Sequence, residues 1–329
     1  MLKTDFYDII YMRIGRVVFV SAKTFKTIDE QLEILRAKGL VINDYDRARD
    51  ILLRENYFFL NGYRSPFLVT GSKRFVDGAT FDELYALFTF DRYFRNIIFK
   101  NVLIVENNYK SIFSYVLSAK YGYKEKDYLN PDNFDRSKEK TRQINDLIRK
   151  VKRQIRINGY QHAATSHYIN NYGYIPLWVG VKVLSFGIMG ELFQVLKRED
   201  QEGIAGYYDN LQADDLGNYL SILSNYRNLC AHEDILFNHE TQKGIDDTSI
   251  HDILNIPKVD DEYIYGKHDI FALIIILKHL LTYTDFKMMM NEIDYEIDWL
   301  ASRLNSIDVK KVLYRMGFPD NYKEIAYIE

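Results

Sequence analysis

TFDELYALFTFDRYFRNIIFKNVLIVENNYKSIFSYVLSAK, residues 80–120, is the stretch on which the predicted fold of this 329-residue chain depends. It contains neither glycine nor proline, and Thr80 with Glu83 forms the capping-box pattern that opens a helix. Its apolar residues recur at helical rather than alternating spacing. At 1.5 Å per residue, about forty residues span roughly 60 Å, so the stretch predicts one very long helix or two helices joined by a bend.

Helical signals continue on both sides of this stretch, whereas strand signals are few and scattered. We therefore predict an all-α fold, a helical bundle formed by residues 79–329 with an N-terminal extension and a small helical region in residues 1–78. Residues 11–20 are compatible with a strand or with a poorly ordered extension. The further helices are expected at about 28–39, 44–55, 136–156, 176–196, 212–232, 268–284, 285–303 and 306–316.

Composition limits the classes of function. Hydrophobic content of 47% and charged content of 27% are typical of a soluble globular protein, and the net charge of −3 argues against nucleic-acid binding by the protein as a whole. The single cysteine, Cys230, excludes an internal disulfide and a cysteine-based zinc site, and fits a reducing cytoplasm. No apolar run is long and free enough of charge to predict a membrane span or a secretory signal.

The run Tyr226-Arg227-Asn228-Leu229-Cys230-Ala231-His232 places an arginine, an amide and a histidine near the end of a predicted helix. Asn228 and His232 are four residues apart and share a helical face, whereas Arg227 and His232 are five apart and point about 140° from each other. Arg227 can therefore meet His232 only by wrapping its long side chain or across a partner chain.

These residue types suit RNA cleavage without a metal. A histidine can take up or release a proton near neutral pH, and a guanidinium can hold a phosphate and stabilise the added charge of its transition state. The ribose 2′-OH next to the scissile phosphate would be the attacking group. The spacing alone favours a hydrogen-bonded helix end over a catalytic site, because an arginine and a histidine five residues apart occur by chance in many helices. Cys230 beside His232 is best interpreted as a buried packing residue.

Arg227-Asn228-x-x-x-His232 resembles the R-x4-6-H motif of the HEPN superfamily of helical ribonucleases, and its surroundings resemble the Abi-like (AbiD/AbiF) abortive-infection proteins. The resemblance extends over about residues 23–325 in an ordered series of separate stretches. These are KTFKTIDEQLEILRAKGLVI (23–42), ENYFFLNGYRSPF (55–67), IPLWVGVKVLSFGIMGELF (175–193), LSNYRNLCAHEDILFN (223–238) and MGFPDNYKEI (316–325).

The resemblance implies a HEPN-type bundle and a metal-independent endoribonuclease that acts as a toxic effector in phage defence, without a cofactor. It implies that Arg227 holds the scissile phosphate, that His232 transfers the proton and that Asn228 orients one of them. Glu106 matches an acidic position on the family's early helix and would support the site or simply cap a neighbouring interaction. The family commonly forms homodimers, and its AbiF-like members are associated with a small structured RNA.

Two alternatives remain open at this point: a non-catalytic HEPN-type module that binds RNA, and a purely structural helical protein. Residues 136–156 bear on the choice, because nine basic residues face two acidic ones there, a net charge of +7. The segment can follow an RNA backbone or be an ordinary solvated helix. Its candidate RNA-binding residues are Arg149, Lys150, Lys152, Arg153 and Arg156.

Two weaker signals complete the sequence analysis. Tyr63 and Arg64 lie in an aromatic segment that forms either an RNA-contacting surface or, as we prefer, a satellite core that docks the N-terminal helices. His239, Asp246 and Asp247 suggest a metal site, but they do not follow a recognised ligand spacing, so we predict none.

Overall fold

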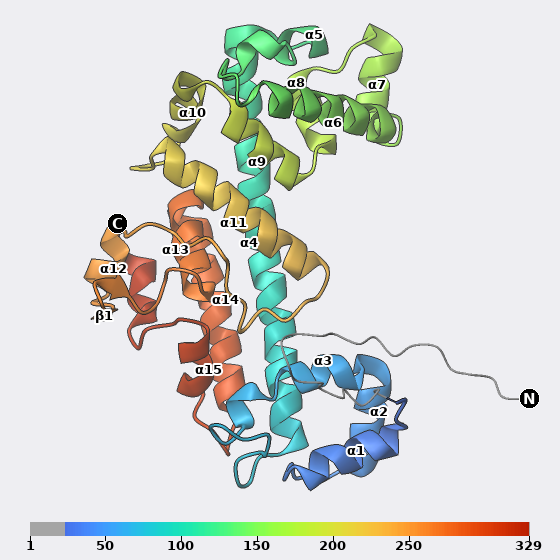
Figure 1. Ribbon diagram of the computed structural model, residues 1–329, viewed down its shortest axis with the longest axis vertical. Helices are drawn as coiled ribbons and strands as arrows, with labels where there is room; N and C mark the ends of the chain where they lie inside the picture. Colours follow the sequence, from blue (N-terminus) through green and yellow to red (C-terminus); the bar gives the residue numbers. More distant parts are fainter. Residues whose placement is uncertain (1–23, 329) are drawn as a thin grey trace, which may run out of the picture.

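The computed structural model describes residues 24–328, and one helix runs through most of the length of the molecule (Figure 1). This helix, α4, extends without interruption over Phe81–Tyr121, so the alternative of one very long helix is correct. Thr80 and Glu83 form the expected capping box at its start. It ends at Gly122, whose φ of 95° lies in the region that favours glycine.

Three short helices lie around the N-terminal end of α4 (Figure 1): α1 (Ile28–Ala37), α2 (Tyr45–Glu55) and α3 (Tyr57–Gly62). The 3-10 turn Ser65–Phe67 follows. Tyr63 is 1% exposed, which supports the satellite core over an RNA-contacting surface at this residue. The strand or extension considered for residues 11–20 lies outside the described residues.

At the other end of α4 the chain forms α5 (Glu125–Tyr128), the 3-10 turn Pro131–Asn133, α6 (Thr141–Gly159), α7 (Ala163–Tyr172) and α8 (Leu177–Gly180) (Figure 1). The basic segment is therefore helical from Thr141 onward.

The single helix expected over 176–196 is wrong. After α8 come the 3-10 turn Val181–Val183 and a separate helix, α9 (Phe186–Val195). The side chain of Ser185 accepts the N–H of Ile188 and so caps α9. Lys110 of α4 donates to the carbonyl of Leu184 at 2.8 Å, which satisfies a backbone acceptor that the interruption leaves free.

The second half of the chain packs back on α4. Helices α11 and α14 both contact α4 directly, and α11 crosses it near the middle (Figure 1). The prediction of an all-α fold is confirmed, since the only sheet within residues 24–328 is a two-stranded antiparallel hairpin. The elements are α10 (Arg198–Ala205), α11 (Ala213–Ala231), α12 (Ser249–Ile253), β1 (Lys258–Val259), β2 (Glu262–Tyr263), α13 (Ile270–Leu280), α14 (Tyr283–Ala301), α15 (Lys310–Arg315) and a last 3-10 turn, Tyr322–Tyr327. Among these helices none combines the length and the apolar character that crossing a membrane requires.

A fully buried carboxylate joins α4 to the loop that follows α11. Asp91 accepts hydrogen bonds from the Tyr63 hydroxyl at 2.7 Å and from the backbone N–H groups of Leu236 and Phe237 at 3.0 and 2.8 Å. Arg95, one helical turn further along α4, forms a buried ion pair with it. Every neighbour in this set is a donor, as an ionised carboxylate requires.

We predict that Asp91→Ala lowers the free energy of unfolding by about 3–5 kcal/mol, because Arg95 is left as an uncompensated buried charge. The loss is measured as a shift of the urea-unfolding curve. Asp50→Ala is the matched control, since it removes the exposed partner of Arg54 at the same four-residue spacing and should cost under about 1 kcal/mol. Equal effects of the two substitutions would contradict the importance assigned to Asp91.

Candidate functional site

Arg227 lies on α11 where this helix crosses α4. Its side chain is 36% exposed, and its Nε faces Oε2 of Glu106 at 3.8 Å. The guanidinium carbon is 5.8 Å from the centre of the Phe99 ring, also on α4. The expected proximity of Glu106 to Arg227 is thus present, although 3.8 Å is longer than a hydrogen bond.

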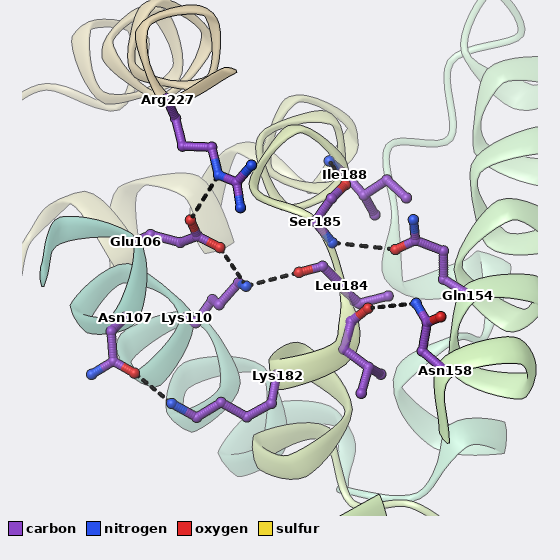
Figure 2. Close-up of polar contacts among 11 residues, drawn as sticks. Glu106, Asn107, Lys110, Gln154, Asn158, Lys182, Leu184, Ser185, Ile188 and Arg227 are labelled. Atoms are coloured by element: carbon purple, nitrogen blue, oxygen red, sulfur yellow. Dashed lines mark hydrogen bonds and ion pairs between the residues drawn. The ribbon is translucent and has the colours of Figure 1, made fainter. Parts of the chain in front are cut away.

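Glu106 is held by a second, closer cation (Figure 2). Its Oε1 accepts a hydrogen bond from Lys110 Nζ at 2.6 Å, one turn along α4, and Lys110 also donates to the Leu184 carbonyl. Glu106 and Lys110 are 8% and 7% exposed, so both charges are removed from bulk water. Each of them needs the other, because a buried charge without a partner is costly.

The cluster of Glu106, Lys110 and Arg227 carries two positive charges and one negative charge. In Figure 2 the Nε of Arg227 is the nitrogen joined to Glu106, and neither terminal nitrogen donates a hydrogen bond to a described residue. Glu106 therefore orients the guanidinium from its Nε side, and the two terminal nitrogens can bind an anion. A phosphate fits this geometry and charge.

His232 ends α11, and its side chain is exposed. It lines a cavity of about 460 Å³ between α4, the N-terminal helices and the loop after α11. Arg92 of α4 also lines this cavity and forms a bidentate ion pair with Glu55 at 3.0 and 2.6 Å. The buried Arg95 contributes to the wall as well.

The structure brings Arg227 together with Glu106, but it does not bring Arg227 and His232 into contact within one chain. Arg227 is not among the residues that line the His232 cavity. Asn228 is exposed, and within residues 24–328 its side chain makes no hydrogen bond with either neighbour. Both motif ends therefore face α4, at different levels along it.

Asp91 binds the backbone of Leu236 and Phe237 shortly after the motif. Sequence reasoning missed this residue and its ion-pair partner, Arg95. Their four-residue spacing is a readable signal, but this spacing is also the commonest arrangement of an exposed helical ion pair. Sequence reasoning also missed the ion pair of Glu55 and Arg92, because these residues meet only when α2 docks beside α4.

The other candidate groups near the motif have structural partners. Burial raises the pKa of the Cys230 thiol to about 12, so Cys230 is a neutral packing residue as predicted. His239 lies 2.8 Å from the Asn225 side chain, and burial lowers its pKa. Asp247 pairs with Lys267 at 2.6 Å. Within the described part of the chain, no group of three or more His, Cys, Asp or Glu residues could hold a metal ion.

The basic segment divides into paired and unpaired residues on α6. Arg149 pairs with Asp146, and Lys150 pairs with Glu191 at 2.6 Å. Three exposed residues nearer the end of the helix have no ion-pair partner among the described residues. They are Lys152, Arg153 and Arg156.

Comparison with known proteins gives one match. The model of the family described as Abi-like protein matches residues 50–238, which is more than half of the chain and includes both α4 and the whole motif. Neither a curated protein nor a solved structure matches. The chain belongs to the Abi-like protein family.

Proposed function

We propose that this protein is a metal-independent endoribonuclease of the HEPN type. The observation that carries the proposal is the geometry of Arg227, whose Nε side faces the buried Glu106 while its two terminal nitrogens have no partner among residues 24–328. In this proposal Arg227 holds the scissile phosphate, His232 transfers the proton and Asn228 orients one of them. Glu106 is the positioning residue of Arg227.

The reaction would proceed by attack of the ribose 2′-oxygen on the adjacent phosphorus. A bond forms between these atoms, the bond from phosphorus to the 5′-oxygen breaks, and the products are a 2′,3′-cyclic phosphate and a 5′-hydroxyl. The 2′-OH proton passes to a base, and an acid gives a proton to the departing 5′-oxygen. In a homodimer, the two copies of His232 would supply one base and one acid.

A homodimer also accounts for the separation of the motif residues. Arg227 and His232 do not share a cavity within one chain. Two copies that place their α11 ends side by side would bring the arginine of one copy near the histidine of the other. The same arrangement would line a single cleft with two motifs.

Membership of the Abi-like family suggests abortive-infection defence against phage. We propose that the enzyme is its toxic effector and that a small structured RNA restrains it. The basic residues of α6, namely Arg149, Lys150, Lys152, Arg153 and Arg156, are the proposed RNA-contacting surface. In this proposal residues 79–329 form the HEPN-like region and residues 1–78 are an accessory region.

One observation favours a second function, a non-catalytic RNA-binding module. Arg227 and His232 are not in contact in the single chain, whereas the unpaired basic residues of α6 need no partner chain to bind RNA. Both functions require RNA binding, but only the ribonuclease cleaves the RNA.

We predict that His232→Ala lowers the rate of RNA cleavage by about 10²–10⁴-fold and leaves RNA affinity within about threefold, because it removes only the proton-transfer group. Cleavage of total cellular RNA is measured in EDTA after removal of co-purified RNA. His162→Ala is the control, since it removes an exposed histidine at the start of α7. RNA binding without cleavage by the wild type would establish the non-catalytic module instead.

We predict that Glu106→Gln lowers the cleavage rate at saturating RNA by about tenfold, because the guanidinium of Arg227 loses the charge that orients it. The value of KM should change little, since Arg227 itself is retained. Glu191→Gln provides the comparison, because it neutralises the partner of Lys150 on an exposed ion pair. Loss of folded protein with an unchanged rate per folded molecule would assign Glu106 a purely structural role.

A further inference from the structure

A second and larger cavity lies at the other end of the molecule, where α5, α6 and the segment between α7 and α8 meet. Its volume is about 660 Å³, within the range of cavities that hold a small organic ligand. The apolar side chains of Leu129, Ile155 and Ile175 form its floor and are nearly fully buried. A flat apolar group can therefore displace water from this floor with a gain in free energy.

The rim of this cavity is strongly basic. Lys124, Lys126, Lys152 and Arg156 line it, and Glu125 is the one acidic residue among its lining residues. The Glu125 carboxylate accepts the backbone N–H of Ile175 at 2.7 Å, so it is already engaged. In the described chain, none of the four cations has a carboxylate within ion-pair distance, and an anionic ligand would meet uncompensated positive charge.

Aromatic rings stand beside these cations. Tyr160 and Tyr174 line the cavity, and Tyr160 is 64% exposed although it is a large ring. The ammonium group of Lys124 lies 4.8 Å from the centre of the Tyr174 ring. The aromatic surface continues through Tyr123, which lies 5.8 Å from Tyr174 and 5.6 Å from Trp178 between ring centres.

We propose that this cavity binds unpaired nucleotides of an RNA, with a base on the apolar floor beside Tyr160 and the flanking phosphates on Lys152 and Arg156. Alternating aromatic and basic side chains favour single-stranded nucleic acid, because exposed bases stack on rings while the backbone follows the cations. An A-form duplex keeps its bases stacked inside and offers this cavity only phosphates. A single free nucleotide would not use the aromatic surface that continues to Trp178.

The inference rests on the proposed function, since RNA is the partner in both. It assigns RNA binding to a cavity that is separate from the Arg227 motif. The first lining residue along the chain, Lys124, comes eighteen residues after Glu106, and neither Glu106 nor Arg227 lines the cavity. It would therefore hold the RNA and not act in its cleavage, and its loss would change affinity rather than the rate at saturation.

The test measures the affinity of full-length protein for a short unstructured RNA and for a duplex of the same sequence, in a His232→Ala background so that the RNA stays intact. We expect Tyr160→Ala to weaken binding of the unpaired RNA about tenfold, and binding of the duplex by less than about twofold. We expect K152A/R156A to reduce the salt dependence of binding by a slope of roughly 1.4, and Tyr160→Ala to leave the slope unchanged.

Two matched variants control for charge and for surface aromatics. K310A/K311A removes two exposed charges from α15, outside both the cavity and the basic segment, and Tyr295→Ala removes a 69% exposed ring from α14. Neither should produce the selective loss for unpaired RNA. The cavity assignment is overturned if K310A/K311A weakens binding as much as K152A/R156A, or if duplex and unpaired RNA lose affinity equally with Tyr160→Ala.

Cleavage is scored separately with His232 intact, so the two proposals fail in different ways. Selective binding with no cleavage by any variant would retain the RNA cavity and remove the ribonuclease. Cleavage with KM and rate unaffected by Tyr160→Ala and K152A/R156A would retain the ribonuclease and remove the cavity.

Discussion

The structure depends on charged side chains that α4 buries and that take further hydrogen-bond partners from later segments of the chain. A buried ion costs several kcal/mol unless a partner meets it, so each one restricts the position of the segment that provides the partner. Glu83 accepts the backbone N–H groups of Asn305 and Ser306 at 2.7 and 2.6 Å. These groups follow Glu83 by more than two hundred residues, and the carboxylate fixes them at the start of α4.

The motif lies between two such carboxylates. Glu106 faces Arg227 at the beginning of the motif, and Asp91 binds the backbone of Leu236 and Phe237 just after His232. The end of α11 and the following turn are thereby fixed against α4 at both sides. A site that requires a set orientation of one guanidinium benefits from this rigidity, because catalytic groups stabilise a transition state best when they are already in place.

The proposed cleavage site and the proposed RNA-binding cavity lie at different positions along α4. The Arg227 cluster lies near the middle of α4, and the basic aromatic cavity begins just beyond its C-terminal end. A long helix is a stiff spacer with a fixed rise per residue. An RNA bound in the cavity beyond the C-terminal end of α4 would reach the motif only if its strand were long enough. The length of α4 would in this way restrict which RNAs can be cleaved.

Local sequence predicted the parts of this arrangement that local rules control. The Thr80–Glu83 capping box and the absence of glycine and proline gave α4, and family resemblance placed Glu106 beside Arg227. The interruption near Leu184 was not foreseen, because the donor that satisfies the Leu184 carbonyl is Lys110, seventy-four residues earlier. The Asp91 network escaped for the same reason.

The sequence indicated only some of the residues that line the cavity beyond the C-terminal end of α4. The charge of Lys152 and Arg156 stood out in one segment, and Tyr160 directly follows the same helix. Tyr174 and Lys124 come from two other places in the chain and join them only after folding. The basic residues of α6 also differ in whether they form ion pairs, which composition does not show. Arg149 and Lys150 have carboxylate partners, and the charge count alone treats them like their neighbours.

The central claim is that Arg227 and His232 cleave RNA through attack of the 2′-oxygen. The most direct measurement is mass spectrometry of the RNA ends that wild-type protein produces in EDTA. The account predicts 2′,3′-cyclic phosphate or 3′-phosphate ends paired with 5′-hydroxyl ends, absent with His232→Ala. Fragments with 5′-phosphate and 3′-hydroxyl ends, or cleavage that requires added magnesium, would contradict it.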